Sequence, residues 1–399
     1  SYSVTGVQTC ALPILWQLLG DRLASGTGRE GLLYFGFEDE RLADMKASDL
    51  HLVVDEYYRL HPEWRDKKRA AFFLDEIQVV PGWEVFVRRL LDTEKAELFL
   101  SGSSSRLLSR EVATSMRGRA LSALVHPFSF REYLRYLGRE PETRPDRLPK
   151  AARSALEKDL IAYLAGGGFP ETLGASLSDR ADLLKSYVDT ALLRDVVERH
   201  GVTQPGVLRW MTRHLLANAA GSFSIGKFYK DIRSQGFSVA KDTLYEYLGH
   251  LEDAFLIRTV WLASGSERRR MVNPRKVYPV DPGLIPLYEQ SGRPNAGHAL
   301  ETVIMLELER RGAGVSYVRT ENGMEVDFLA RYPDGTSELI QACADTRPAE
   351  TLAREVRSLL EAAKEHRNAS LHLVGLNQDP PQSLPKGIQW QPASQWLLG

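Results

Sequence analysis

The sequence predicts an α/β fold that begins with a parallel sheet, and three observations favour it. Short apolar runs at Leu32–Phe37, Ala70–Leu74 and Ala96–Leu100 alternate with amphipathic segments, a pattern typical of a parallel sheet covered on both faces. Helical periodicity dominates residues 151–252, and strand-like runs return after His298. We therefore expect an α/β region, a mainly helical region and a second α/β region.

Helices are expected around the first three strands. Leucines recur at helical spacing from Leu15 and stop near Gly26, where a glycine ends a helix readily. Asp49–Trp64 is amphipathic but is interrupted by Pro62, and Trp83–Leu91 has the same helical pattern. Each helix would therefore connect one strand to the next.

Composition limits the class of protein. The chain has 399 residues, enough for two or three domains, with 43% hydrophobic and 26% charged residues and a formal net charge of −1. The near-neutral charge argues against a protein that coats nucleic acid. Two cysteines give no disulfide framework, so a cytoplasmic location is expected. No apolar run approaches the ~20 residues that span a bilayer, so we expect no membrane partner.

The first residues have an unusual pattern. Val4–Ile14 resembles the conceptual translation of a widely used DNA-sequencing adapter. We therefore expect residues 1–14 to be foreign and the natural sequence to begin near Leu15. The alternative is an ordinary short strand and loop. Without this segment, Cys343 is the one cysteine left in the sequence.

The apolar run Phe72–Leu74 ends in Asp75-Glu76, which matches a Walker B motif. Ligands of open parallel sheets bind beyond the carboxyl ends of the strands, where these acids would emerge. Asp75 would hold Mg²⁺ directly or through water, and Glu76 would polarise an attacking water. The alternative is a buried strand followed by an acidic turn.

Further motifs follow in a fixed order after this pair. They are Gly82-Trp83-Glu84, Ser101–Ser105, Arg117-Gly118-Arg119 and His126–Leu134. The ordered set resembles a large prokaryotic group of AAA+-like ATP-binding proteins that carry a C-terminal domain of unknown function. The resemblance covers Leu15–Gly399. It implies a P-loop NTPase-like domain at residues 15–139, followed by a proline-rich linker at 140–150.

The resemblance also implies roles for other residues. Ser101 or Ser103 stands where a polar sensor would detect the γ-phosphate. Arg117 and Arg119 would neutralise transition-state charge, if necessary across the subunit interface of a homo-oligomer. The alternative for both arginines is a solvated basic turn. The segment that starts at His126 is expected to be structural.

One motif of this group is missing. A phosphate-binding loop needs Gly-x-x-x-x-Gly-Lys-Ser/Thr between a strand and a helix. In the group it precedes the helix that begins here at Leu15, and the adapter-like segment occupies that place. We therefore expect the intact family member to bind and hydrolyse Mg·ATP. The chain as written should bind ATP weakly and turn it over poorly or not at all.

Residues 151–295 end in a pattern like a winged helix. Two helices are expected at 224–236 and 238–251, followed by strands at about 254–262 and 276–280. The loop between these strands is basic and could contact DNA phosphates without reading sequence. Its cations are Arg268, Arg269, Arg270, Arg275 and Lys276. The alternative is a solvated hairpin in a protein-interaction module.

Residues 296–399 resemble the core of restriction-endonuclease-like nucleases. Glu301 and Asp327 occupy positions that match metal ligands of that fold, but Gln341 and Cys343 stand where its Glu and Lys are expected. We therefore expect an inactive nuclease fold, with Cys343 as a small buried residue.

Two functions are thus predicted. The first is an AAA+-type ATPase that uses ATP and Mg²⁺ in its intact form. The alternative is a non-catalytic scaffold that binds DNA or protein through the winged helix and the degenerate nuclease fold. An active nuclease is the third and least favoured interpretation.

Overall fold

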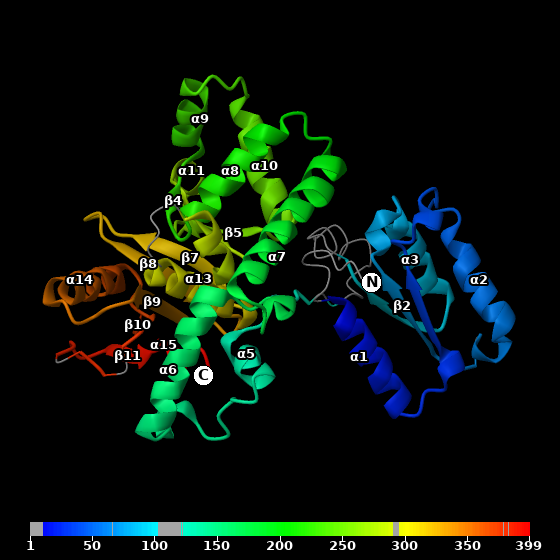
Figure 1. The fold of residues 1–399 in the computed structure, drawn as a ribbon, viewed down its shortest axis with the longest axis horizontal. Coiled ribbons are helices and arrows are strands. Elements are labelled where there is room, and N and C mark those ends of the chain that lie inside the picture. Colours follow the sequence, from blue (N-terminus) through cyan, green and yellow to red (C-terminus); the bar gives the residue numbers. More distant parts are fainter. Residues whose placement is uncertain are drawn as a thin grey trace. The chain divides into compact units, whose positions relative to one another are not determined.

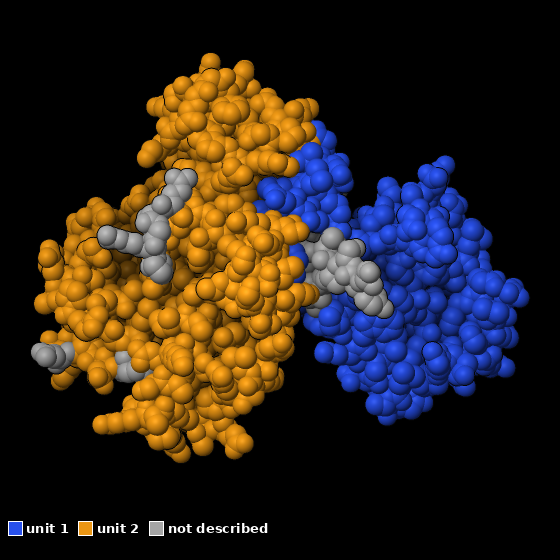
Figure 2. Space-filling model, viewed as in Figure 1, with its two compact units in different colours: residues 1–126, 187–201, 253–255 blue, residues 127–186, 202–252, 256–399 orange. Residues whose placement is uncertain are grey.

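A computed structural model describes residues 11–65, 67–102, 121, 123–289, 295–377, 379–381 and 383–399. The chain divides into two compact units, which are coloured separately in Figure 2. Unit 1 comprises residues 1–126, 187–201 and 253–255, and unit 2 comprises residues 127–186, 202–252 and 256–399. Each unit is described by itself.

Unit 1 contains a parallel sheet of three strands (Figure 1). The strands are β1 (Leu32–Gly36), β2 (Ala70–Asp75) and β3 (Ala96–Leu100), with β2 in the centre. Every residue of β2 before Asp75 is buried, as a central strand covered on both faces requires. The parallel α/β arrangement predicted for the N-terminal region is confirmed.

Helices cover both faces of this sheet. Helix α1 (Ala11–Ala24) packs Leu15 against Ala71 and Phe73. Helices α2 (Leu50–Leu60) and α3 (Trp83–Thr93) pack with Phe72 and Leu74 on the other face. Successive side chains of a strand point to opposite faces, so β2 supplies both cores. The short 3-10 helix Pro62–Trp64 follows α2, as expected from Pro62.

Unit 2 is mainly helical before its sheet. Its first helix, α5 (Phe130–Tyr136), begins with a capping box in which Ser129 and Glu132 bond each other's backbone N–H. Helix α7 (Leu177–Thr190) begins in unit 2, and its last residues belong to unit 1. The π-helical segment η9 (Ala191–Glu198) follows it directly. The other helices are α6 (Lys150–Gly166), α8 (Pro205–Ala217), α9 (Ile225–Ser234), α10 (Lys241–Asp253), α11 (Glu267–Val272), α12 (Ile285–Tyr288), α13 (Ala296–Arg310), α14 (Ala349–Glu365) and α15 (Ala393–Trp396).

A single sheet of eight strands joins the regions predicted at residues 151–295 and 296–399. Its strand order is β11-β10-β9-β8-β7-β5-β6-β4. Strand β5 pairs antiparallel with β6 and parallel with β7, so the sheet continues across the predicted boundary at residue 295. That boundary stays a prediction. The strands are β4 (Ser222–Phe223), β5 (Ile257–Leu262), β6 (Arg275–Pro279), β7 (Gly314–Arg319), β8 (Glu325–Arg331), β9 (Ser337–Cys343), β10 (Ser370–Gly375) and β11 (Ile388–Pro392).

One local expectation needs correction. The basic segment between β5 and β6 was expected to be a loop, but residues Glu267–Val272 form the short helix α11. Ser266 caps it by accepting a hydrogen bond from the backbone N–H of Arg269.

Among the described residues, no helix is long and apolar enough to cross a membrane.

A tight turn after α6 fixes part of the core of unit 2. Gly167 has a φ of +79° and lies against the Asp281 carboxylate. That buried carboxylate accepts hydrogen bonds from the backbone N–H groups of Gly168, at 2.7 Å, and Gly283, at 2.8 Å. A side chain at residue 167 would therefore displace Asp281 from both donors.

We predict that Gly167→Ala destabilises unit 2 by several kcal/mol, about 3 or more, because strain, steric overlap and lost buried hydrogen bonds combine. Gly174→Ala is the matched control, since Gly174 has a φ of +82° but no atom within 4 Å of an added Cβ. The control should show the backbone strain alone. Urea unfolding followed by circular dichroism measures both variants, and equal losses would contradict the role of Asp281.

Candidate functional site

The Asp75 carboxylate lies at the carboxyl edge of the sheet in unit 1, between two hydroxyl groups. The Tyr34 phenol of β1 donates a hydrogen bond to Oδ2 at 2.9 Å. The Ser101 hydroxyl, directly after β3, donates to Oδ1. Both carboxylate oxygens therefore receive a hydrogen bond from a neighbouring strand.

Strand register explains this convergence. Gly36 pairs with Asp75 and Leu74 pairs with Leu100, so the three strands end at one edge. Tyr34 precedes Gly36 by two residues and points to the same face. The phenol extends along the strand past Gly36, where an added Cβ would lie 3.5 Å from the Tyr34 hydroxyl.

Glu76 is held in a strained position beside this carboxylate. It has a φ of 54°, in the left-handed region, and it is only 5% exposed. Its backbone N–H donates to the Ser101 hydroxyl at 3.3 Å, and its carboxylate accepts a hydrogen bond from the Gln78 side-chain amide. Non-glycine residues in this conformation cost about 1–3 kcal/mol and concentrate at functional sites.

Negative charge accumulates around the Tyr34 phenol. Burial raises its pKa first, and the hydrogen bond to Asp75 and the charges of Glu38 and Glu76 raise it further. Within the same unit, Arg194 of η9 lies 3.1 Å from Glu38. Among the described residues, the edge of the sheet is thus acidic and is bordered by the Arg194 guanidinium.

This acidic edge fits a magnesium site that is completed by phosphate. Among the described residues, no three His, Cys, Asp or Glu side chains are placed to hold a metal ion by themselves. Mg²⁺ in nucleotide sites commonly takes only one or two carboxylates, together with substrate phosphates and water. One carboxylate, that of Asp75, is enough for that lower requirement.

The predicted site residues of unit 1 have different outcomes. The structure brings Asp75, Glu76 and Ser101 together. Ser103, Arg117 and Arg119 lie outside the described residues. Tyr34 was not predicted, because a tyrosine in an apolar strand has the pattern of a core residue.

Unit 2 holds a second charged cluster, around Lys276 of β6. The ammonium nitrogen lies 2.8 Å from an oxygen of Asp327, 2.9 Å from Glu301 and 3.1 Å from Glu325. Lys276 is only 4% exposed. Burial lowers its pKa, but the three carboxylates outweigh that effect and hold the pKa above its ordinary value.

This placement corrects the predicted group of DNA-contacting cations. Lys276 is enclosed by carboxylates and cannot reach a phosphate. Arg275 is half-buried, with its guanidinium 3.7 Å from the centre of the Trp261 ring. Arg268 and Arg269 of α11 are exposed, and Arg270 is partly exposed and pairs with Glu267.

Gln341 and Cys343 of β9 take different positions in this region. The Gln341 amide donates to Asp327 at 2.9 Å and to Glu355 of α14 at 2.8 Å. The Cys343 thiol is buried and donates to the backbone carbonyl of Asp345. Burial raises the pKa of Cys343 to about 11, so the thiol stays protonated at neutral pH.

Three charged residues of the cluster were not assigned to it from the sequence, and one of them, Glu325, lies two residues before Asp327 on the same strand. The other two come from distant elements. Lys276 supplies a cation from β6, and Glu355 supplies a carboxylate from α14. Lys276 contacts Asp327, and Glu355 contacts Gln341, in both cases across a long distance in sequence. No spacing in the sequence connects them with Asp327, so no local signal could have found them.

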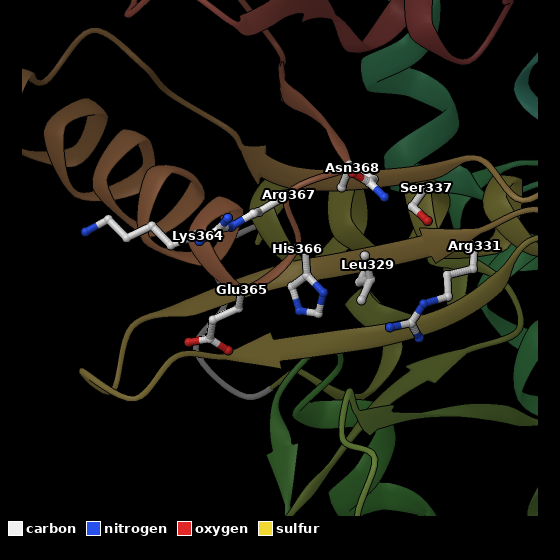
Figure 3. A pocket seen from close by; sticks show the side chains of 9 residues that line it. Leu329, Arg331, Ser337, Lys364, Glu365, His366, Arg367 and Asn368 are labelled. Carbon is white, nitrogen blue, oxygen red and sulfur yellow. The ribbon is translucent and has the colours of Figure 1, made fainter.

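A separate pocket of about 420 Å³ lies between the end of α14 and strands β8 and β9. Figure 3 shows the side chains that line it. Its polar lining includes Arg331, Glu365 and His366, while Lys364 pairs with Glu361 at 2.7 Å. Burial lowers the pKa of the His366 imidazole. The cavity contains none of the predicted site residues.

Comparisons with known proteins match two segments of the chain. A family model described as an AAA domain matches residues 14–134, and one described as a domain of unknown function (DUF8612) matches residues 157–291. The first match includes Tyr34, Asp75, Glu76 and Ser101. Together with the parallel sheet, it supports a P-loop ATPase-like domain at the N-terminus.

Relatives that match most of the chain are also found. The uncharacterized protein MJ1544 of Methanocaldococcus jannaschii is 32% identical over 358 residues, which cover 88% of this chain and 77% of the relative. An uncharacterized protein of Haemophilus influenzae is 28% identical over 335 residues, covering 83% and 79%. The Aeropyrum pernix ORC1 protein, solved in complex with DNA, is a structural match at 14% sequence identity. The match covers 70% of this chain and 82% of the ORC1 chain. Its TM-score is 0.28, too low to carry an argument.

We predict that Lys276→Met destabilises unit 2 by about 3–5 kcal/mol at neutral pH, because it leaves buried carboxylates without a counter-ion. Burial and the neighbouring Asp327 already raise the pKa of Glu301. A carboxyl with a raised folded-state pKa favours the fold when protonated and opposes it as pH rises through that pKa. The loss should therefore shrink between pH 8 and pH 5.

Thermal unfolding across this pH range measures the effect. Lys364→Met is the control, because Lys364 is exposed and its pair with Glu361 lies in water. It should behave like the wild type at every pH. A Lys276→Met loss that does not change with pH would contradict the proposed link to the carboxylates.

Proposed function

Because this chain belongs to the same protein family as MJ1544 of Methanocaldococcus jannaschii, and its N-terminal region matches an AAA domain, we propose that its intact form is an AAA+-type ATPase. One observation carries the proposal. Asp75 is the last residue of the central strand of a parallel sheet, Glu76 follows it, and Ser101, directly after the neighbouring strand, contacts Asp75. Proteins of the AAA type generally use ATP and Mg²⁺.

The proposed reaction is attack of water on the γ-phosphate of Mg·ATP, which releases ADP and phosphate. Mg²⁺, when bound, would offset the charge of the phosphate oxygens. Asp75 would hold the metal directly or through water, and Glu76 would orient and polarise the attacking water. Ser101 or Ser103 detects phosphate, and Arg117 or Arg119 supplies positive charge, including across the interface of a homo-oligomer.

The surroundings of the two acids support these different roles. Asp75 is held by two hydroxyl donors, which leave lone pairs on both oxygens for a metal or its water. Glu76 is buried, and its strained backbone and the Gln78 amide fix its direction. A rigid carboxylate beside the metal ligand suits a residue that orients water.

A second candidate function is a scaffold that binds DNA or protein. It is favoured by the order α9, α10, β5 and β6, which follows that of a winged helix, and by the exposed Arg268 and Arg269 on α11. The C-terminal strands would then form an inactive nuclease-like fold. The buried Cys343 thiol and the fully engaged Lys276 support its inactivity.

These proposals imply a domain order. Residues 15–139 form the ATPase domain without its phosphate-binding loop, and residues 140–150 form a linker. Residues 151–295 form the helical and winged-helix region, and residues 296–399 form the nuclease-like domain.

We predict that restoring Gly-x-x-x-x-Gly-Lys-Ser/Thr ahead of Leu15 produces Mg²⁺-dependent phosphate release from ATP. Glu76→Gln should lower kcat by about 10²–10⁴-fold, because it removes the group that polarises water, and should leave ATP affinity unchanged. Glu56→Gln is the control, since Glu56 is exposed on α2 and pairs only with Arg59 among the contacts described. A restored protein that releases no phosphate would refute the ATPase proposal.

For the second candidate, we predict that neutralising Arg268, Arg269 and Arg270 together weakens binding to duplex DNA and reduces its dependence on salt, because phosphate contacts release counter-ions. Neutralising the exposed Arg144, Arg147 and Lys150 removes the same charge from the predicted linker and serves as the control. Fluorescence anisotropy at several salt concentrations measures both. Equal losses in the two variants would mean nonspecific attraction and would count against α11 as the contact.

A further inference from the structure

The pocket at the end of α14 has an apolar floor and a polar rim. Leu329 of β8 forms the floor and is only 1% exposed. Four polar side chains line the rim: Arg331 of β8, Ser337 of β9, and His366 and Asn368 of the turn that connects α14 with β10. Figure 3 shows these four side chains around Leu329.

The end of α14 explains why the sheet is hollowed at this place. Leu329 and Arg331 lie two residues apart on β8, so their side chains point to the same face of the sheet. Helix α14 covers that face and packs Leu359 against Leu329. The helix ends at Glu365, one turn before Arg331 would be covered. Arg331 pairs across the strands with Ser337, which adds a hydroxyl to the uncovered part.

The polar groups of the rim are not used by the protein itself. None of the four side chains makes a hydrogen bond or an ion pair with another residue in the part of the chain that the structure describes. Among the described residues that line the pocket, Glu365 is the only acid. Its carboxylate accepts a hydrogen bond from the backbone N–H of Glu321 at 3.4 Å, and Figure 3 shows it beyond His366, away from Arg331.

The electrostatics of the rim favour an anion. Burial is the larger cause that lowers the pKa of His366, and the positive charge of Arg331 lowers it further. The protonated imidazole and the guanidinium therefore repel each other, and an anion between them would offset that repulsion. The planar guanidinium fork matches the oxygens of a phosphate group. A phosphate monoester carries about 1.5 to 2 negative charges at neutral pH, whereas a carboxylate carries only one.

We propose that this pocket binds a phosphate monoester, with the phosphate held by Arg331 and His366 and the organic group against Leu329. The Ser337 hydroxyl and the Asn368 amide supply further donors. The volume of about 420 Å³ falls within the range of small-molecule sites, about 300–1,000 Å³, and leaves room for more than the phosphate. Because every lining residue belongs to unit 2, binding here does not require the ATPase function proposed for unit 1.

The test titrates the full chain with phenyl phosphate in a calorimeter. Arg331→Gln should weaken binding by about tenfold or more, because it removes charged hydrogen bonds to the phosphate. Nuclear magnetic resonance of protein with isotope-labelled histidine locates the site. The Cε1–H signal of His366, which is assigned by its loss in His366→Gln, should shift when phenyl phosphate is added to the wild type.

Arg209→Gln is the matched control. Arg209 is an exposed arginine of α8 in unit 2, and it does not line the pocket. The variant loses the same charge and should bind phenyl phosphate like the wild type. Benzoate, which has the same ring but a singly charged carboxylate, should bind the wild type more weakly. Circular dichroism checks that the variants are folded, and His366→Gln replaces Arg331→Gln in the calorimeter if that variant does not fold.

Four results would overturn the proposal. The first is a wild type that binds no phenyl phosphate, and the second is binding that leaves the His366 signal unmoved. Equal losses in Arg331→Gln and Arg209→Gln would mean that only the net charge of the protein matters. Benzoate that binds as tightly as phenyl phosphate would rule out a site built for phosphate.

Discussion

The parallel pairing of β1, β2 and β3 is the constraint on which the candidate nucleotide site depends. The pairing ends all three strands at one edge, so residues far apart in sequence meet there. Because β2 is buried on both faces, it can carry polar groups only at its end, where Asp75 is partly exposed. The register of the three strands therefore determines both the buried core and the position of the candidate site.

Much of unit 1 could be predicted from the sequence, for a physical reason. A strand buried on both faces must be apolar throughout, so Ala70–Leu74 was visible as a strand and Asp75 as its end. Ser101 was placed at the nucleotide site by resemblance, but its hydrogen bond to Asp75 was not predicted. Nor was the Tyr34 contact, because it depends on which residues pair between β1 and β2, and an apolar run leaves that register open.

Unit 2 shows where local patterns fail. Lys276 follows four arginines closely in sequence and therefore had the pattern of a solvated basic loop, but β6 turns its side chain into a buried acidic cluster. Its partners Glu301 and Asp327 come from a helix and a strand distant in sequence. The same long-range packing brings Glu355 to Gln341. The chemistry of this cluster belongs to the tertiary fold and cannot be assigned from one β-strand.

The eight-stranded sheet has a consequence for how this protein can evolve. Since β5 and β7 pair with each other, residues on the two sides of the predicted boundary at 295 share one hydrogen-bonded sheet. A gene fragment that ends between β5 and β7 would leave unpaired backbone N–H and C=O groups on both strands. Such exposed strand edges pair with strands of other molecules. Recombination that transfers only one of these two regions to another gene would therefore yield products that self-associate. The two parts are expected to be inherited together.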